Sequence, residues 1–310
     1  MKISSWIIIT LLAHCPLALA QETILKNNSN GDKIMMHLNF SSKHVANRSV
    51  EVWLPPGYEG KKEKKYPVIY MHDGQFIFNS KNNSQADWGM DQLLSTLISE
   101  GKTPEIIVVA IWNTPYRIAE YMPQKAFDLL SHEQLANIPN IKGFRPQSDE
   151  YLKFIVTELK PFIDHTYPTL PERENTAIMG ASMGGLISLY AICEYPEIFG
   201  YAGCLSTHFP IGNGIMLEYL KSHLPEPEHH KIYYDFGTRT LDAQYEPYQR
   251  KVDLMMKEQG WVENKNWITK KFEGHDHSEK AWRSRVHIPL IFFFGLKETA
   301  GQLQDHIEPK

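Results

Sequence analysis

Hydrophobic and polar residues alternate near the start of the chain and then change to short, uninterrupted apolar runs. Between about residues 34 and 54, IMMHLNF and RSVEVWLP alternate apolar with polar side chains, as half-buried antiparallel strands do. Continuous apolar runs, typical of parallel strands that helices cover on both faces, then follow. These runs are residues 67–74, 105–112, 175–181, 200–206 and 231–237. We therefore predict an N-terminal antiparallel hairpin followed by a mostly parallel sheet.

Segments with helical periodicity separate these apolar runs. Because strand and helix alternate from residue 65 onward, the pattern predicts the α/β fold class, with helices on both faces of a central sheet. No repeat or low-complexity linker divides the chain, so we predict one domain over residues 21–310. Residues 123–146 interrupt the alternation and predict an insertion that overhangs the site as a cap. The predicted helices are residues 87–101, 149–164, 184–196 and 246–260.

The first twenty residues have the pattern of a cleaved secretory signal. A lysine stands near the start, residues 6–12 are apolar, and Ala-Leu-Ala precedes Gln21. A membrane anchor is the alternative, but His14 and Pro16 interrupt the segment, which falls short of the roughly 20 apolar residues a span requires. We therefore predict a signal peptide over residues 1–20, a secreted or periplasmic protein, and no stable membrane insertion once the signal is removed.

Composition and charge exclude few functions. The net charge is −4 and charges of both signs are mixed along the chain, so no basic stripe indicates a nucleic-acid partner. The 7 Trp, 15 Tyr and 14 Phe residues can build a core or line a sugar or aryl site. Cys15 leaves with the predicted signal, whereas Cys193 and Cys204 can form a disulfide or remain buried thiols.

A serine between glycines, in GASMG over residues 180–184, is the first candidate for chemistry. It follows a predicted strand and precedes a predicted helix, the context in which G-x-S-x-G forms a sharp turn with the serine at its tip. Glycines on both sides let the strand and helix backbones approach closely, and the helix N-terminus points its dipole at the site. Ser182 is therefore the candidate nucleophile, and a helix N-cap is the simpler alternative.

In this kind of site the acid and the histidine follow the serine along the chain. Asp235 lies inside a predicted strand, whereas Asp242 lies in the following loop, at the carboxyl edge where such sheets place their sites. Asp242 is therefore the preferred acid, although an aspartate there also suits the N-cap of the helix that begins near Glu246. The candidate bases are His275 and His277, and the residues alone do not separate them.

Other histidines and the oxyanion donors complete the candidate chemistry. A His-x-His pair can bind zinc, but no third ligand stands at a recognisable spacing, so we predict neither a metal site nor a cofactor. His229 and His230 are expected at the solvated surface. A tetrahedral intermediate needs two hydrogen-bond donors, and the backbone N–H groups of Met183 and of Gln75 are the candidates. The His-Asp-Gly sequence before Gln75 is otherwise an ordinary turn.

Several of these segments, taken in order, resemble one family. The chain resembles the esterase family of α/β-hydrolases, which includes S-formylglutathione hydrolase, feruloyl and acetyl xylan esterases, enterochelin esterases and mycolyltransferases. The resemblance covers residues 48 to 296 and implies an α/β-hydrolase fold and ester hydrolysis. The matching segments are YMHDGQFIF, IIVVAIWNTPYRIAEYMP, DEYLKFIVTELKPFIDHTYPT, IMGASMGGLISLY, PEIFGYAGCLS, FGTRTLDAQYEPYQRKVDLM and FEGHDHSEKAW.

The resemblance also implies roles for single residues. His277 precedes a short acidic-to-Trp stretch as the family's base does, Asp242 corresponds to the acid of relatives with a GTxTLD-type loop, and Gln75 directly follows Asp-Gly as a second oxyanion donor. One departure concerns the acid, because some feruloyl esterases carry it nearer the Gly-Thr, where this chain has Arg239 and Thr240. The residues predicted to contact substrate are Trp282 and Asp73.

Together these features predict a secreted serine esterase acting on acyl groups attached to a carbohydrate or small polar alcohol. Three alternatives remain: a siderophore trilactone esterase, an acyltransferase, and a noncatalytic binding module with this fold. A siderophore esterase needs basic residues at the mouth of its site, and the candidates are Arg117, Lys125, Arg145 and Arg239. For Arg117, an ion pair with Glu120 is the expected arrangement. The expected partner is a small-molecule or glycan-linked ester, and no oligomeric state is predicted.

Overall fold

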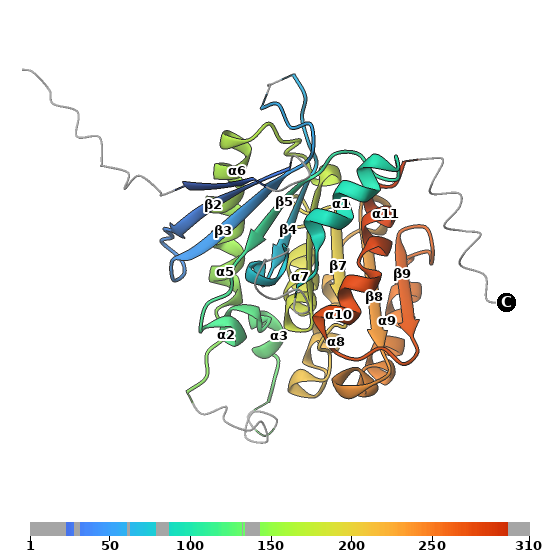
Figure 1. Cartoon of the computed structure of the whole chain (residues 1–310). Coiled ribbons are helices and arrows are strands. Elements are labelled where there is room, and N and C mark those ends of the chain that lie inside the picture. Colours follow the sequence, from blue (N-terminus) through green and yellow to red (C-terminus); the bar gives the residue numbers. More distant parts are fainter. Residues whose placement is uncertain are drawn as a thin grey trace, which may run out of the picture.

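A single twisted sheet forms the centre of the molecule (Figure 1). The computed structural model describes residues 23–27, 32–60, 63–78, 87–131, 133 and 143–296. Within these ranges nine strands form the sheet, in the order β1-β2-β3-β5-β4-β6-β7-β8-β9. The predicted signal over residues 1–20 lies outside the described residues, as do residues 132 and 134–142 of the predicted cap.

The predicted N-terminal hairpin is confirmed. Strand β2 (Lys33–Phe40) pairs antiparallel with β3 (Arg48–Leu54), and β1 (Thr23–Asn27) adds a further antiparallel strand outside β2. Buried and more exposed side chains largely alternate along β2, because only one face of this strand packs on the core. Strand β3 is almost wholly buried and joins the hairpin to the rest of the sheet through an antiparallel pairing with β5.

The strands predicted from apolar runs are parallel, as expected. Helices cover both of their faces, so side chains pointing either way are buried and the runs show no alternation. Parallel pairing brings the carboxyl ends of these strands to one edge of the sheet. These strands are β4 (Val68–His72), β5 (Ile107–Ile111), β6 (Thr176–Ala181), β7 (Tyr201–Leu205) and β8 (Lys231–Gly237). A further parallel strand, β9 (Trp267–Phe272), which is only partly buried and was not among the predicted runs, pairs with β8 at the edge of the sheet.

The predicted helices are present, and the one over residues 149–164 contains a π-helical turn, η2 (Ile155–Leu159), between α5 and α6. Within the predicted cap, the described residues include one short helix, α3. The helices are α1 (Met90–Ser99), α2 (Arg117–Tyr121), α3 (Gln124–Phe127), α5 (Ser148–Phe154), α6 (Lys160–Thr166), α7 (Met183–Glu194), α8 (Ile215–His223), α9 (Glu246–Glu258), α10 (Glu279–Arg285) and α11 (His287–Phe294).

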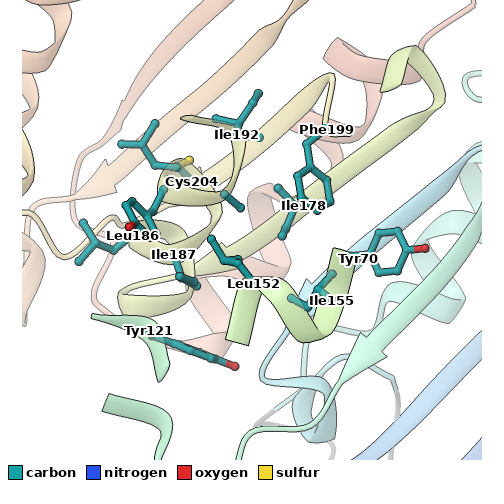
Figure 2. Packing of buried hydrophobic residues seen from close by; sticks show 14 of the residues in the cluster. Tyr70, Tyr121, Leu152, Ile155, Ile178, Leu186, Ile187, Ile192, Phe199 and Cys204 are labelled. Carbon is teal, nitrogen blue, oxygen red and sulfur yellow. The ribbon is translucent and has the colours of Figure 1, made fainter. Parts of the chain in front are cut away.

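The sheet separates two hydrophobic cores. Along β4, Val68 and Tyr70 face the first core, whereas Ile69 and Met71 face the second. Helices α2, α3, α5, α6, α7, α8 and α9 contribute to the first core, part of which Figure 2 shows around α7. Helices α1, α10 and α11 cover the second core, and Figure 1 shows them on the face that is nearer the viewer. The α/β fold class with helices on both faces is therefore confirmed.

A histidine and a pair of cysteines differ in how well they match the expectations from sequence. His230 is buried, and its two ring nitrogens lie 2.7 Å from the Glu226 carbonyl oxygen and 2.9 Å from that of Pro196, so the prediction that it lies at the solvated surface was wrong. Cys193 and Cys204 are free thiols rather than a disulfide. Across the described ranges, no helix combines the length and the hydrophobicity that a transmembrane span requires.

Candidate active site

Ser182 occupies the sharp turn between β6 and α7. Its backbone has φ 60° and ψ −121°, in the positive-φ region that non-glycine residues rarely adopt. The chain holds this conformation through hydrogen bonds, because the Ser182 N–H donates to the Leu205 carbonyl (2.9 Å) and the Ser182 carbonyl accepts from the N–H of Leu186 (3.1 Å). The Ser182 side chain makes no capping hydrogen bond to α7, which argues against the N-cap alternative.

The glycines around Ser182 have different roles. A Cβ at Gly180 would lie 2.8 Å from the backbone of Gly184, so this strand-to-helix approach requires glycine. At Gly184 a Cβ would lie 3.4 Å from the Asp73 carboxylate, which is ordinary contact. The next residue, Gly185, packs closely against the end of β7, because a Cβ there would lie 3.1 Å from the Leu205 carbonyl oxygen. The expectation that both flanking glycines are needed for close packing is thus confirmed for Gly180 and not for Gly184, whereas the close packing at Gly185 was not expected.

The two predicted oxyanion donors lie at the starts of helices. Met183 is the first residue of α7, where backbone N–H groups lack intrahelical partners. Gln75 lies in a short 3-10 helix, η1 (Gly74–Phe76), which follows β4. Asp73 turns the chain there with φ 57°, and a Cβ at Gly74 would lie 2.5 Å from the backbone of Ala110, so only glycine fits against the end of β5.

His277 and Asp242 are in direct contact. The imidazole Nδ1 lies 2.6 Å from Asp242 Oδ1, and its side chain retains 11% exposure beside a fully buried carboxylate. Burial opposes ionisation of Asp242, but hydrogen bonds from His277, Ser206 and the Gly237 N–H outweigh burial and lower the pKa of the carboxyl. An ionised carboxylate here holds His277 with its proton on Nδ1, leaving Nε2 as an acceptor.

The alternative candidates for acid and base are engaged elsewhere. Asp235 is buried and accepts hydrogen bonds from the Ser206 N–H (3.0 Å) and the Tyr233 hydroxyl (3.0 Å). His275 contributes its backbone instead, because its carbonyl accepts from the N–H groups of Thr238 and Arg239, both at 3.0 Å. Nor does Asp242 cap α9, since the residue before that helix is Tyr245.

Ser206, at the carboxyl end of β7, hydrogen-bonds the carboxylate of Asp242. Its hydroxyl donates to Asp242 Oδ2 (2.6 Å) and accepts from Trp282 Nε1 (3.0 Å) and Arg285 Nη2 (2.6 Å). Arg285 also pairs with Asp235, with Nη2 3.0 Å from Oδ1. Sequence reasoning missed Ser206 and Arg285, although a polar residue directly after an apolar strand was a signal for Ser206.

Trp282 and Asp73, the residues predicted to contact substrate, both have partners within the protein beside the candidate site. The Trp282 ring is 7% exposed and stands edge-on to the His277 ring, with centroids 5.0 Å apart. The Asp73 carboxylate is bound by Arg117 through two contacts, at 2.6 and 2.8 Å, and by Asn113 Nδ2 at 2.5 Å. Because these partners occupy its oxygens, Asp73 holds the loops beside the site together.

The predicted ion pair between Arg117 and Glu120 was wrong. Arg117 extends from the start of α2 to Asp73, whereas Glu120 points into the core and pairs with Arg48 of β3, at 2.6 and 3.0 Å. Arg117 therefore pairs with the residue that follows β4, and Glu120 pairs with a residue of β3. The two side chains do not pair with each other, although both lie on the short helix α2. Lys125, another predicted basic residue of the mouth, forms an ion pair with Glu194.

Two further residues beside Ser182 were missed by sequence reasoning. The Tyr245 hydroxyl lies 2.6 Å from His208 Nδ1, and burial raises the pKa of this phenol while an interaction with Ser182 opposes the rise. The Tyr245 ring also stands edge-on to His277, with centroids 5.7 Å apart. Tyr245 therefore lies against both His208 and His277. No motif marks His208 or Tyr245 in the sequence.

A hollow in the described part of the protein lies away from this site. This hollow, of about 820 Å³, is lined by residues that include Arg173, Tyr201, His229 and Lys231, near the amino ends of β7 and β8 and thus at the sheet edge opposite Ser182. Among the residues that the structure describes, no group of three or more His, Cys, Asp or Glu side chains has the arrangement of a metal site.

Curated relatives share part of the chain. The Bacillus subtilis protein YjcH is 33% identical over 204 residues, which cover 66% of this chain and 72% of YjcH. The B. subtilis protein YbbA is 29% identical over 166 residues, 53% of this chain and 59% of YbbA. An endo-1,4-beta-xylanase/feruloyl esterase of Xylanibacter ruminicola is 30% identical over 169 residues, 53% of this chain and 20% of that protein. The chain thus spans less than two thirds of YbbA and one fifth of the Xylanibacter protein.

Solved structures and a family model agree with the fold. The enterobactin esterase of Shigella flexneri superposes with a TM-score of 0.63 at 18% identity, covering 89% of this chain and 59% of that one. A ferulic acid esterase of Anaeromyces mucronatus gives 0.56 at 19% identity, with coverages of 88% and 90%. These likenesses confirm the α/β-hydrolase fold. The family model described as "Putative esterase" matches residues 41–291. The chain therefore belongs to this esterase family of α/β-hydrolases.

Proposed function

We propose that the protein is a secreted serine esterase that hydrolyses carboxylic esters with Ser182, His277 and Asp242. The observation that carries the proposal is the 2.6 Å contact between His277 and Asp242, formed beside a serine whose backbone adopts the positive φ of a nucleophile turn. Membership of the esterase family supports the same activity.

The proposed reaction follows from these positions. His277 Nε2 takes the Ser182 proton as Oγ attacks the ester carbonyl, and Asp242 keeps the imidazole in the required tautomer. The N–H groups of Met183 and Gln75 hydrogen-bond the oxyanion of the tetrahedral intermediate. The alcohol leaves with a proton from His277, and water, activated by the same imidazole, then releases the acid from Ser182.

For the substrate, we propose acyl groups attached to a carbohydrate. Exposed apolar side chains flank the site residues: Phe76 follows Gln75, and Leu241 precedes Asp242, with exposed fractions of 38% and 47%. Tyr116 and Ile118, on either side of Arg117, are also exposed. Exposed apolar side chains at these positions favour an apolar or aryl acyl group. The name of the Xylanibacter relative, a xylanase and feruloyl esterase, supports the same substrate class.

The basic residues predicted at the mouth of the site give less support to the siderophore-esterase alternative. Arg117 is neutralised by Asp73 and Lys125 by Glu194, whereas Arg145 and Arg239 remain exposed.

A panel of esters distinguishes the two substrate classes: feruloyl sugars, acetylated xylan, short p-nitrophenyl esters and enterobactin. A kcat/KM for enterobactin above that for feruloyl sugars would contradict the carbohydrate proposal. Appearance of a transferred ester with an added alcohol would instead indicate acyl transfer.

The nucleophile is tested by substitution and labelling. We expect Ser182→Ala to lower kcat for p-nitrophenyl acetate by about 10⁴- to 10⁶-fold, because no other group supplies the covalent step. A fluorophosphonate probe should label the parent at Ser182, as read by peptide mass spectrometry. Ser222→Ala, at an exposed position of α8, is the matched control and should behave like the parent. A folded parent that is not labelled would instead support a noncatalytic binding role.

Export is a separate part of the proposal. The apolar segment before Ala-Leu-Ala supports removal of residues 1–20, so the intact mass of the exported protein should correspond to a chain that begins at Gln21. Ile8→Arg, which places a charge in the apolar segment, should leave the protein unprocessed inside the cell. A mature protein that retains Met1 would contradict this prediction.

A further inference from the structure

The turn that carries the second candidate oxyanion donor has a conformation that needs support. Asp73, which follows β4, has φ 57° and ψ 44°, in the left-handed region that few non-glycine residues adopt. Gly74 packs against the end of β5, where a Cβ would lie 2.5 Å from the Ala110 backbone. Gln75 is the second residue of η1, so its N–H has no acceptor within that helix. The direction of this N–H therefore depends on the backbone of the turn.

Side chains from the segment after β5 and from α2 hold this turn. The Asp73 carboxylate binds the Arg117 guanidinium through two contacts, Nε to Oδ1 at 2.6 Å and Nη2 to Oδ2 at 2.8 Å, and accepts from Asn113 Nδ2 at 2.5 Å. The Asn113 N–H donates to Gln75 Oε1 (3.1 Å), and the Asp73 N–H donates to the Tyr121 hydroxyl (3.2 Å). We name Asp73, Asn113 and Arg117 the turn clamp. Its contacts fix the chain just before the Gln75 N–H and the side chain just after it.

The ion pair in the turn clamp is partly buried. The side chains of Arg117 and Asp73 are 27% and 16% exposed, and the guanidinium lies over the Tyr121 ring, 5.0 Å from its centroid. Burial opposes the charge of Arg117, but the hydrogen bond and the charge of Asp73 outweigh burial and raise the pKa of the guanidinium. A planar guanidinium that meets a carboxylate through two hydrogen bonds fixes its orientation as well as its distance.

We propose that Arg117 and Asn113 are positioning residues, which aim the Gln75 N–H at the ester oxyanion through their contacts with Asp73 and Gln75. This inference rests on the proposed esterase function. Backbone in the left-handed region persists only where surrounding contacts hold it. Loss of the Arg117 fork therefore frees Asp73 to leave that region, and the Gln75 N–H turns away with the backbone. The alternative role for Arg117 is direct contact with an anionic substrate.

These two roles have different kinetic effects. A ground-state ester carbonyl is a weak acceptor, and the hydrogen bond from Gln75 strengthens as that oxygen gains charge, so a misdirected N–H raises the energy of the transition state more than that of the bound ester. Acylation and deacylation both pass through such an oxyanion. Loss of the turn clamp should therefore slow both steps by the same factor, which lowers kcat and leaves KM unchanged.

Variants assayed with the neutral ester p-nitrophenyl acetate test this inference. We expect Arg117→Met to lower kcat by about 10- to 100-fold, at or below the loss of a whole oxyanion-hole donor, and to change KM less than about threefold. Arg117→Lys keeps the charge and one donor but not the fork, so it should recover part of the rate. Asn113→Ala removes one contact with the carboxylate and should lower kcat by about 3- to 10-fold. In an Asp73→Asn background, Arg117→Met should have little further effect, because both changes break the same contact.

Two further measurements distinguish positioning from a general loss of folded protein. A fluorophosphonate probe titrates the active sites, so kcat can be expressed per labelled Ser182 and an unfolded fraction does not lower it. A trifluoromethyl ketone mimics the intermediate: Ser182 Oγ bonds to its carbonyl carbon, the serine proton goes to His277, and the carbonyl oxygen becomes the oxyanion. Its Ki should rise in Arg117→Met by the factor by which kcat/KM falls.

Arg250→Met serves as the control for loss of a paired arginine. Arg250 also makes two carboxylate contacts, to Glu246 (3.2 Å) and Asp253 (2.9 Å), but within α9, so this variant should match the parent in kcat, KM and Ki. A raised KM at unchanged kcat in Arg117→Met would mean that Arg117 binds the substrate and would overturn the inference.

An unchanged rate in Arg117→Met, a lower kcat with an unchanged ketone Ki, no recovery in Arg117→Lys, or a full loss from Arg117→Met in the Asp73→Asn background would overturn it equally. A parent with neither turnover nor fluorophosphonate labelling would instead contradict the esterase proposal itself.

Discussion

At the scale of single residues, one hydroxyl connects the groups behind the candidate acid. Ser206 is fully buried with φ 39°, and its single proton and two lone pairs are all used, by Asp242, Trp282 and Arg285. Because each group has a fixed partner, the Asp242 carboxylate can be buried and still ionised. The orientation of His277 is therefore determined through contacts that begin at the end of β7.

Asp242→Asn tests this arrangement through rate and pH dependence. An amide at this position donates to His277 Nδ1, which moves the imidazole proton to Nε2, so kcat should fall by about 10⁴-fold. The folded-state pKa of Asp242 lies below that of the unfolded chain, so ionised Asp242 stabilises the protein above about pH 4, and this contribution is lost as the pH falls through the folded-state pKa.

The free energy of unfolding, measured by urea titration from pH 7 to pH 2.5, provides the readout. The parent should exceed Asp242→Asn by about 1 to 3 kcal/mol at neutral pH, and the difference should shrink in the acidic range. A difference that stays constant down to pH 2.5 would show that the carboxylate charge does not contribute to stability.

At the scale of elements, the turn between β6 and α7 depends on close backbone packing. The positive φ of Ser182 is sustained because β6, α7 and the end of β7 are hydrogen-bonded around it, and Gly180 allows the helix to begin directly above the strand. Such strain persists only where the surrounding structure holds it. The turn therefore holds Ser182 against the end of β7 and the segment that follows it.

A pair of glycine substitutions tests this packing. Gly180→Ala places a methyl group 2.8 Å from the Gly184 backbone, so we expect a loss of about 1 to 3 kcal/mol in unfolding free energy, together with at least a tenfold loss of kcat as the turn shifts. Gly184→Ala meets only ordinary contact with Asp73 and improves helix propensity, so its stability should equal or exceed that of the parent. Equal stability of the two variants would contradict the proposed role of Gly180.

At the scale of the whole molecule, the sheet joins both cores into one unit. Each central strand contributes alternate side chains to the two cores, and the hairpin is continuous with the parallel strands through β3 and β5. The ion pair between Arg48 of β3 and Glu120 of α2 adds a buried polar link, and α2 in turn carries Arg117 to the site. The two cores therefore share the strands of one sheet.

This continuity predicts cooperative unfolding. Trp53 and Trp282 belong to the second core and Trp267 to the first, so tryptophan fluorescence reports both cores while far-ultraviolet circular dichroism reports the backbone. The two signals should follow one urea transition with the same midpoint. Separate midpoints, or a stable fragment from limited proteolysis that retains only part of the sheet, would contradict the prediction of a single domain.

Sequence reasoning succeeded where the signal is local. The strand and helix positions follow from periods of about 2 and 3.6 residues, and the Ser182 turn follows from glycines that stand next to it in the chain. It also selected Asp242 from its place at the sheet edge and His277 from the family resemblance, and these two side chains lie in contact; their catalytic roles stay a prediction. The predicted ion pair between Arg117 and Glu120 was wrong, because these two residues are close in sequence but each pairs with a residue that the sheet brings near, Asp73 and Arg48.

Short-range patterns in the sequence were enough to predict the α/β class, the family, the turn that holds the candidate nucleophile, and the edge of the sheet where the candidate site lies. The folded chain was needed to show that Arg117 binds Asp73, 44 residues away, that Ser206 meets Arg285, 79 residues away, and that the His208 N–H bonds the Ser182 carbonyl while its imidazole meets Tyr245. The physical reason is that hydrogen bonds act over about 3 Å, and strands distant along the chain come within that reach only once the sheet has assembled.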